Sequence, residues 1–271
     1  KPDYLAGTSA GGMHAILLGA GYTPQEIIEF FSTTPLLKMF YPKLSRHGIV
    51  TNRGAGKIIQ KMCSDKGYNN LEDLPIPVYV TATDSKTNKP VIIKTGSIEA
   101  AVCATTATIF LEHRKMPDGT LLKDGCYTKN VPFDVLDEIR KDKNIQGKHL
   151  DFCFDVIPDY QATLLPMLNS FNKKILKNDR ARKAIFETTG KGYYLELPSP
   201  LSQMDYNKKA LNKAVALGKQ VLQQLASTIK NDMFFRLVDV KASDLTSTYT
   251  NTQNFNYDIT KIQTVEKEKN M

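Results

Sequence analysis

The chain has 271 residues, of which 41% are hydrophobic and 24% charged, a composition typical of a protein that buries a core. No run approaches the roughly 18 apolar residues that a membrane-spanning helix needs, so we expect any membrane contact to be peripheral. The net charge of +8 is spread at similar density over residues 1–100, 101–200 and 201–271. An even excess argues against a nucleic-acid-binding protein, in which basic residues gather on one element.

Apolar runs of strand type alternate along the chain with segments of helical period. Thr23-Pro24-Gln25-Glu26 predicts a helix start, because threonine is a preferred N-cap, proline is favoured at the first helical position and an acid suits the first turn. Alternating strands and helices predict an α/β fold, a three-layer sandwich with a mostly parallel central sheet. The expected strands cover residues 4–6, 77–83, 89–94, 120–123 and 150–157; the expected helices cover residues 13–18, 52–63, 97–106, 135–140, 164–186 and 211–229, besides the helix that starts at Thr23.

Residues 164–186 combine apolar residues at helical spacing with many lysines and arginines. Such a helix either packs its apolar stripe on the core or lies on an anionic membrane surface. From Ser243 onward the sequence is rich in Thr, Asn and Ser and poor in aliphatic residues. We therefore divide the chain into a domain over residues 1–230 and a C-terminal extension over residues 231–271.

Gly7-Thr8-Ser9-Ala10-Gly11 fits the pattern G-x-S-x-G, lies between a predicted strand and a predicted helix, and is followed by Gly12. At such a turn the serine backbone is strained, and glycines two positions to either side avoid clashes. The N-terminus of the following helix directs backbone N–H groups, beginning with that of Ala10, toward a developing oxyanion. The alternative is a glycine-rich turn with an incidental serine.

A serine hydroxyl needs a base within hydrogen-bond reach to become a nucleophile. One possibility is the chain order of an α/β-hydrolase triad, which Ser9, Asp124 and His149 satisfy. The other is a dyad in which a carboxylate contacts the hydroxyl directly. His149 lies in a polar segment typical of a surface loop, His14 is expected to be a packing or groove residue, and no motif surrounds His113.

Residues 122–132 (LKDGCYTKNVP) resemble the second motif of the patatin family, in which a D-G-G/A turn is followed by N-x-P. Asp124-Gly125 and Asn130-Val131-Pro132 occupy these positions. Residues 7–12 are similar to the family's nucleophile turn, and residues 74–102 and 204–218 follow the family's order. The resemblance covers about residues 1–230 and implies a metal-independent catalytic domain of the patatin type.

What the resemblance implies is a lipid acyl hydrolase of the phospholipase A or lysophospholipase type, with no cofactor and no metal. Ser9 would attack an ester carbonyl, and Asp124 would take the proton and return it to the leaving alcohol. Gly7, Ala10, Gly11 and Gly12 would support the serine turn and the oxyanion, and Gly125 would complete the Asp-Gly motif. The implied partner is a phospholipid or another acyl lipid, with peripheral contact to an anionic membrane.

Three departures from the family pattern bear on activity. The family's glycine-rich oxyanion loop lies upstream of the serine turn, and the sequence starts at Lys1, too late to contain it. Residues 103–109 lack the usual Ala-x-Pro, and Cys126 stands where the family has glycine or alanine, which would strain a turn that needs positive φ. A catalytically weak or inactive lipid-binding protein is therefore an alternative, as is an α/β-hydrolase esterase.

The cysteines show no CxxC spacing and no neighbouring histidine pattern, so neither a zinc site nor a redox pair is indicated. We expect Cys63, Cys103, Cys126 and Cys153 to be buried or half-buried free thiols in a reducing compartment. The expected location is the cytoplasm or the periphery of a membrane, with secretion into a host left open. The sequence does not fix the oligomeric state.

Overall fold

A computed structural model describes residues 1–147, 149, 151–158, 166–189, 192–199 and 208–230 of the chain. Residues 231–271, the expected C-terminal extension, lie outside the described residues. The strands are β1 (Leu5–Thr8), β2 (Tyr41–Ser45), β3 (Gly48–Thr51), β4 (Val78–Asp84), β5 (Pro90–Ile93), β6 (Arg114–Lys115), β7 (Leu121–Asp124), β8 (Asp151–Pro158) and β9 (Gly192–Ser199). The α-helices are α1 (Ala10–Gly19), α2 (Pro24–Thr33), α3 (Leu36–Met39), α4 (Arg53–Asp65), α5 (Ile98–Thr105), α6 (Phe133–Asp142), α7 (Pro166–Thr189) and α8 (Lys208–Lys230).

Strand β4 is the centre of the main sheet and pairs with three other strands. Its pairing with β1 is parallel, whereas its pairings with β5 and β7 are antiparallel, as is the pairing of β6 with β7. The α/β class is confirmed, but the expected predominance of parallel pairing in this sheet is wrong. The sheet is mixed because β5 returns directly on β4 through a short turn, and β7 enters the sheet from the β6–β7 hairpin.

Helices cover both faces of β4. Val78, Val80 and Ala82 point to one face and share a buried cluster with residues of α1, α2, α4 and α5. Tyr79 points to the other face, where it packs against Val135 and Ile139 of α6. Because consecutive strand residues alternate between faces, a strand that is buried throughout must be covered on both sides. The result is the expected three-layer arrangement.

The helix predicted to start at Thr23 is α2, and its start is confirmed in detail. The Glu26 N–H donates to Thr23 Oγ1 at 3.2 Å, and the Thr23 N–H donates to Glu26 Oε2 at 2.7 Å. This reciprocal capping box satisfies two backbone donors that a helix end leaves open. The expected elements at residues 77–83, 97–106, 120–123, 135–140 and 150–157 are also present, each shifted by a few residues at most. The β2–β3 hairpin, helix α3 and strand β9 were not predicted.

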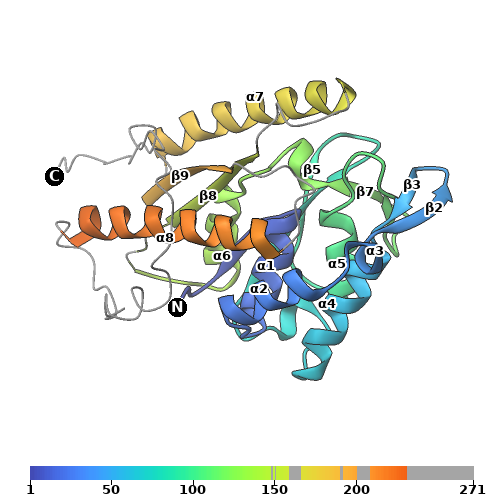
Figure 1. Ribbon diagram of the computed structural model, residues 1–271, viewed down its shortest axis with the longest axis horizontal. Helices are drawn as coiled ribbons and strands as arrows, with labels where there is room; N and C mark the ends of the chain where they lie inside the picture. Colours follow the sequence, from blue (N-terminus) through green and yellow to red (C-terminus); the bar gives the residue numbers. More distant parts are fainter. Residues whose placement is uncertain (148, 150, 159–165, 190–191, 200–207, 231–271) are drawn as a thin grey trace.

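Helix α7 occupies the expected region and runs along the parallel pair β8–β9 (Figure 1). Its inward side chains Ile175 and Phe186 are buried, and Phe186 shares a cluster with Val131, Phe133 and Tyr194. One stripe of this helix therefore packs on the domain. Its outward face carries the exposed cations Lys173, Lys174, Lys177 and Arg180.

All four cysteines are buried free thiols, as expected. Burial raises the pKa of Cys63 to about 11 and that of Cys103 to about 12, which keeps both protonated and unreactive at neutral pH. Within the described residues, no helix is long and apolar enough to cross a membrane.

Candidate active site

Strand β4 brings Ser9 and Asp124 together because β1 and β7 end on the same edge of it. Val80 pairs with Gly7 on one edge and with Ile93 of β5 on the other, so β1 lies opposite β5. Ala82 likewise pairs with both Val91 and Asp124, so β7 also lies opposite β5. On their shared edge, β1 ends where Thr8 faces Thr81, and β7 ends one residue further along β4. Two segments 115 positions apart in sequence therefore meet end to end.

Ser9 stands at the sharp turn between β1 and α1 with φ 54° and ψ −126°. A positive φ is strained for a residue that carries a Cβ atom, and such strain is concentrated at functional sites. Gly7 is required here, since a Cβ atom on it would lie 2.5 Å from the carbonyl oxygen of Gly11. Gly12 is tight against Thr105, at 3.0 Å. The expected clash at Gly11 is wrong: a Cβ atom there would meet nothing within 4 Å.

Asp124 is fully buried and contacts the serine directly. Ser9 Oγ donates to Asp124 Oδ2 at 2.7 Å, and the Cys126 N–H donates to Asp124 Oδ1 at 2.8 Å. Burial raises the pKa of Asp124 from 3.8 to about 6, against the hydrogen bonds from Cys126 and Ser9, which lower it. The carboxylate is thus mostly ionised at neutral pH and has a higher proton affinity than an exposed aspartate.

The Asp124 turn is compact because Gly125 lies directly on β4. A Cβ atom on Gly125 would be 2.4 Å from Thr81 Oγ1, so a larger residue would push the turn away from the strand. Cys126 belongs to a single 3₁₀ turn and is not among the non-glycine residues with positive φ. The strain that its size could cause in a positive-φ turn therefore does not arise.

A group of buried threonines holds the serine turn, and sequence reasoning missed it. The Ser9 N–H donates to Thr105 Oγ1 at 2.8 Å, and the Thr105 hydroxyl donates to the Thr81 carbonyl at 2.7 Å. Thr8 Oγ1 lies 2.6 Å from Thr81 Oγ1 and donates to the Lys129 carbonyl at 2.7 Å. Thr105 lies in the segment that lacks the family's Ala-x-Pro, and the only signal in the sequence was the unusual run Ala-Thr-Thr-Ala-Thr.

The hydrogen bonds of His14 and His113 go to groups other than Ser9 and Asp124. His14 Nδ1 lies 2.7 Å from the carbonyl of Ala10, and its ring stacks on Phe31 with centroids 4.8 Å apart. His113 stacks on His47 and hydrogen-bonds Ser85. His149 lies in the sequence between α6 and β8. Among the described residues no cluster of three or more His, Cys, Asp or Glu side chains could hold a metal ion.

A strained serine after a parallel strand, hydrogen-bonded to a buried aspartate that opens an Asp-Gly turn, is the arrangement that the motifs predict. A family model described as patatin-like phospholipase matches residues 1–137, which include both Ser9 and Asp124. The chain belongs to the patatin-like phospholipase family. This match supports lipid hydrolysis as the activity of the family.

Curated relatives are similar over the same region. An uncharacterised NTE family protein of Mycobacterium bovis is 27% identical to the chain over 147 residues, which is 52% of this chain and 39% of the relative. Uncharacterised NTE family proteins of two Mycobacterium tuberculosis strains match to the same extent. The chain thus spans about 39% of the length of these relatives, and the family model ends within α6. The segments from β8 onward lie beyond the matched family domain.

Proposed function

We propose that the chain hydrolyses carboxyl esters of lipids through a Ser9–Asp124 dyad and an acyl-enzyme. The observation that carries this proposal is the direct 2.7 Å hydrogen bond between Ser9 Oγ and Asp124 Oδ2. A base must lie within about 2.6–3.2 Å of the proton that it abstracts, and Asp124 meets this requirement without an intervening histidine. The raised pKa of Asp124, about 6, suits a group that accepts a proton and then returns it.

In the first half of the reaction, Ser9 Oγ forms a bond to the ester carbonyl carbon while its proton moves to Asp124. The carbonyl oxygen becomes an oxyanion, and the backbone N–H of Ala10, at the first position of α1, is one donor for it. The carbon–oxygen bond to the alcohol then breaks, and the alcohol leaves with the proton from Asp124. Water repeats the sequence on the acyl-enzyme, with Asp124 again as base, and releases the fatty acid.

The substrate class follows from the family, whose members are lipid hydrolases. Phospholipids, lysophospholipids and other acyl lipids share the carboxyl ester that this reaction requires. The direct Ser9–Asp124 contact favours the dyad over a triad that would use His149 as the base.

The test is covalent labelling by a fluorophosphonate probe together with hydrolysis of a soluble short-chain ester. We expect Ser9→Ala to abolish both signals and Asp124→Asn to lower the rate of hydrolysis by about 10²–10⁴-fold, because a general base contributes that much. His149→Ala, the matched variant for the triad, is expected to keep the wild-type rate.

Two results would contradict this mechanism. If the wild-type protein were not labelled, Ser9 would not be an activated nucleophile, and a non-catalytic lipid-binding role would take its place. If His149→Ala were inactive while Asp124→Asn kept its activity, the base would be the histidine.

A further inference from the structure

The exposed apolar side chains gather in one region of the molecule. Among the described residues, eight large hydrophobic side chains are exposed, and five of them lie on α3, on the β2–β3 hairpin or on the loop beside it. Leu44 is 89% exposed and Leu37 is 74% exposed. Single exposed apolar side chains are common on protein surfaces, but a group of them in one region marks an interaction site. The five side chains, together called the hairpin surface, are Leu37, Tyr41, Leu44, Ile49 and Phe110.

The hairpin has an inward and an outward face. On the inward face, Lys43 reaches Glu112, and a Cβ atom on Gly48 would lie 2.5 Å from the backbone nitrogen of Glu112. Leu44 and Ile49 alternate with these residues along the two strands and point away from the domain. Figure 1 shows β2 and β3 projecting from one end of the molecule.

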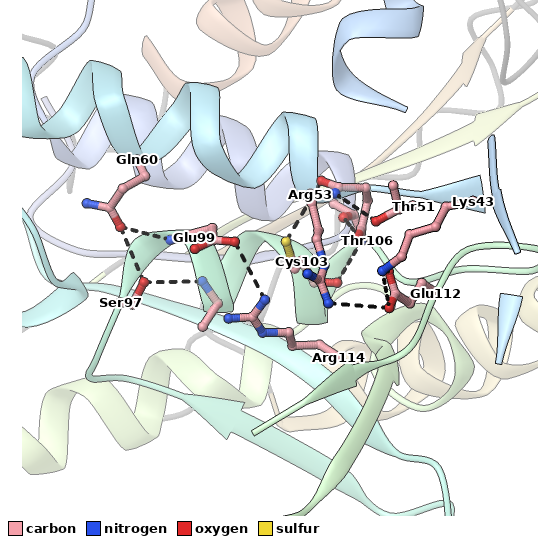
Figure 2. A network of polar contacts seen from close by, with 12 residues as sticks. Lys43, Thr51, Arg53, Gln60, Ser97, Glu99, Cys103, Thr106, Glu112 and Arg114 are labelled. Atoms are coloured by element: carbon pink, nitrogen blue, oxygen red, sulfur yellow. Dashed lines mark hydrogen bonds and ion pairs between the residues drawn. The ribbon is translucent and has the colours of Figure 1, made fainter. Parts of the chain in front are cut away.

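Polar contacts hold the hairpin against the domain, while Leu44 and Ile49 stay exposed. Lys43 and Arg53 both reach the Glu112 carboxylate, at 3.0 Å and 3.4 Å (Figure 2). The Asn52 side chain, buried just after β3, donates to the carbonyl of Cys103 and to Thr106 Oγ1. These contacts tie the middle of β2 and the end of β3 to α5 and to the segment that follows it.

The charge around the hairpin surface is strongly biased, although the charge of the whole chain is spread evenly. Residues 30–64 contain no aspartate or glutamate but six lysines and arginines, of which Lys43 and Arg53 pair with Glu112 and Lys61 pairs with Asp65. Lys38 beside the hairpin and Arg46 at its turn are exposed. Apolar side chains bordered by cations match the interface of a bilayer that contains anionic lipids, because the acyl boundary takes the apolar groups and the headgroups take the charge.

The hairpin surface is connected directly to the Ser9–Asp124 site. The carbonyl of Ala107 accepts the Asp124 N–H at 2.9 Å. Three residues later, the carbonyl of Phe110 accepts the N–H groups of Ile49 and Val50 at 3.0 and 3.1 Å. One short segment, residues 107–110, therefore joins Asp124 to the hairpin.

We infer that the hairpin surface is the membrane-docking element of the chain, inserting Leu44 and Ile49 into anionic phospholipid bilayers. The inference rests on the proposed function only in taking the docked bilayer as the source of substrate. Binding itself requires no catalysis, so the two are tested separately.

The experiment is co-sedimentation of the whole chain, carrying Ser9→Ala to prevent lipid consumption, with vesicles of phosphatidylcholine alone or with added phosphatidylserine. We expect binding to the phosphatidylserine vesicles, and about a tenfold or greater loss of partitioning with Leu44→Glu or Ile49→Glu. Arg46→Glu is expected to lower partitioning at least about fivefold, and more strongly at low salt. Leu44 and Ile49 are exposed, so their replacement leaves the core intact.

The matched control is Ile185→Glu, which changes a 52% exposed aliphatic side chain on the outward side of α7. We expect it to bind vesicles like the parent. Wild-type binding by Leu44→Glu and Ile49→Glu would overturn the inference, and loss with Ile185→Glu alone would assign docking to α7. A dimer that Leu44→Glu dissociates, without any change in vesicle binding, would also overturn it and assign the surface to a second copy. If the wild-type protein, which keeps Ser9, bound vesicles but did not hydrolyse esters, the proposed function alone would be contradicted.

Discussion

At neutral pH the buried, ionised carboxylate of Asp124 lowers the free energy of unfolding. The carboxylate has no exposed surface, and burial outweighs its two hydrogen bonds, so its pKa is raised from 3.8 to about 6. Between these two pH values the folded protein retains a proton that the unfolded chain has released. Stability therefore falls as the pH rises from about 4 to about 6, and the deficit persists above that range.

Because the ionised Asp124 lowers stability, replacing it with a neutral residue should stabilise the fold. Asp124→Asn is nearly isosteric, can accept from the Cys126 N–H and donate to Ser9 Oγ, and carries no buried charge. At pH 7 we expect the variant to hydrolyse esters about 10²–10⁴-fold more slowly and yet to be more stable than the parent by up to about 3 kcal/mol, because each pKa unit corresponds to about 1.4 kcal/mol. The gain should vanish below about pH 4. Urea unfolding of parent and variant at both pH values measures the difference, and an equal effect at the two pH values would contradict the argument.

Thr105 controls the strained backbone of Ser9 from α5. Its hydroxyl accepts the Ser9 N–H and donates to the Thr81 carbonyl, and its side chain is fully buried. Valine has the same shape but can do neither, so it would leave a donor and an acceptor without partners. Such a loss costs about 1–3 kcal/mol. Thr105 is therefore a positioning residue, because it acts through Ser9.

We expect Thr105→Val to lower kcat about 10–100-fold with little change in KM, because a small displacement of a nucleophile acts on the transition state. Thr105→Ser keeps the hydroxyl and should recover most of kcat. The rate of fluorophosphonate labelling gives an independent measure of the nucleophile. If serine and valine lowered kcat equally, the methyl packing of Thr105 would matter and its hydrogen bonds would not.

At the scale of single elements, the sequence predicted helices and strands whose signals lie in adjacent residues. It did not predict how strands from distant segments pair. The capping box at Thr23 and the β-branched run of β4 depend on a few adjacent residues, and both were predicted. The β2–β3 hairpin was missed because Pro42 and the cations interrupt the alternating pattern, and because its inward face is completed by Glu112. Strand polarity was misjudged because β7 reaches β4 from a hairpin rather than through a crossover helix.

The same distinction holds for the site: its two main residues could be predicted from the sequence, but their positions relative to each other could not. Ser9 and Asp124 occupy motifs whose spacing is local, so both could be named from the sequence. Their meeting depends on where β1 and β7 end along β4, which is a property of register. The hydrogen bond from Ser9 to Thr105 joins residues 96 positions apart, and no local pattern distinguishes this threonine from Thr106.

At the scale of the whole molecule, Arg140 joins the family domain to the segments beyond it. This arginine on α6 donates to the Tyr4 hydroxyl at 2.6 Å, just before β1, and to Asp151 Oδ1 at 2.8 Å, at the start of β8. Arg140 and Asp151 are 8% and 6% exposed, so their charges are compensated mainly by each other. The same guanidinium also pairs with Asp137, whose side chain is 76% exposed.

The last prediction compares these two carboxylates. Removing one partner of a buried pair leaves an uncompensated charge and costs about 3–5 kcal/mol, whereas an exposed pair contributes at most about 1 kcal/mol. We expect Arg140→Met to destabilise the fold by the larger amount and Asp137→Ala by the smaller one. The double variant Arg140→Met/Asp151→Leu should recover much of the loss, because it removes both charges. Denaturant unfolding of the three variants tests this, and equal costs for Arg140→Met and Asp137→Ala would mean that Asp151 is not held by Arg140 and that β8 is attached to the family domain by other contacts.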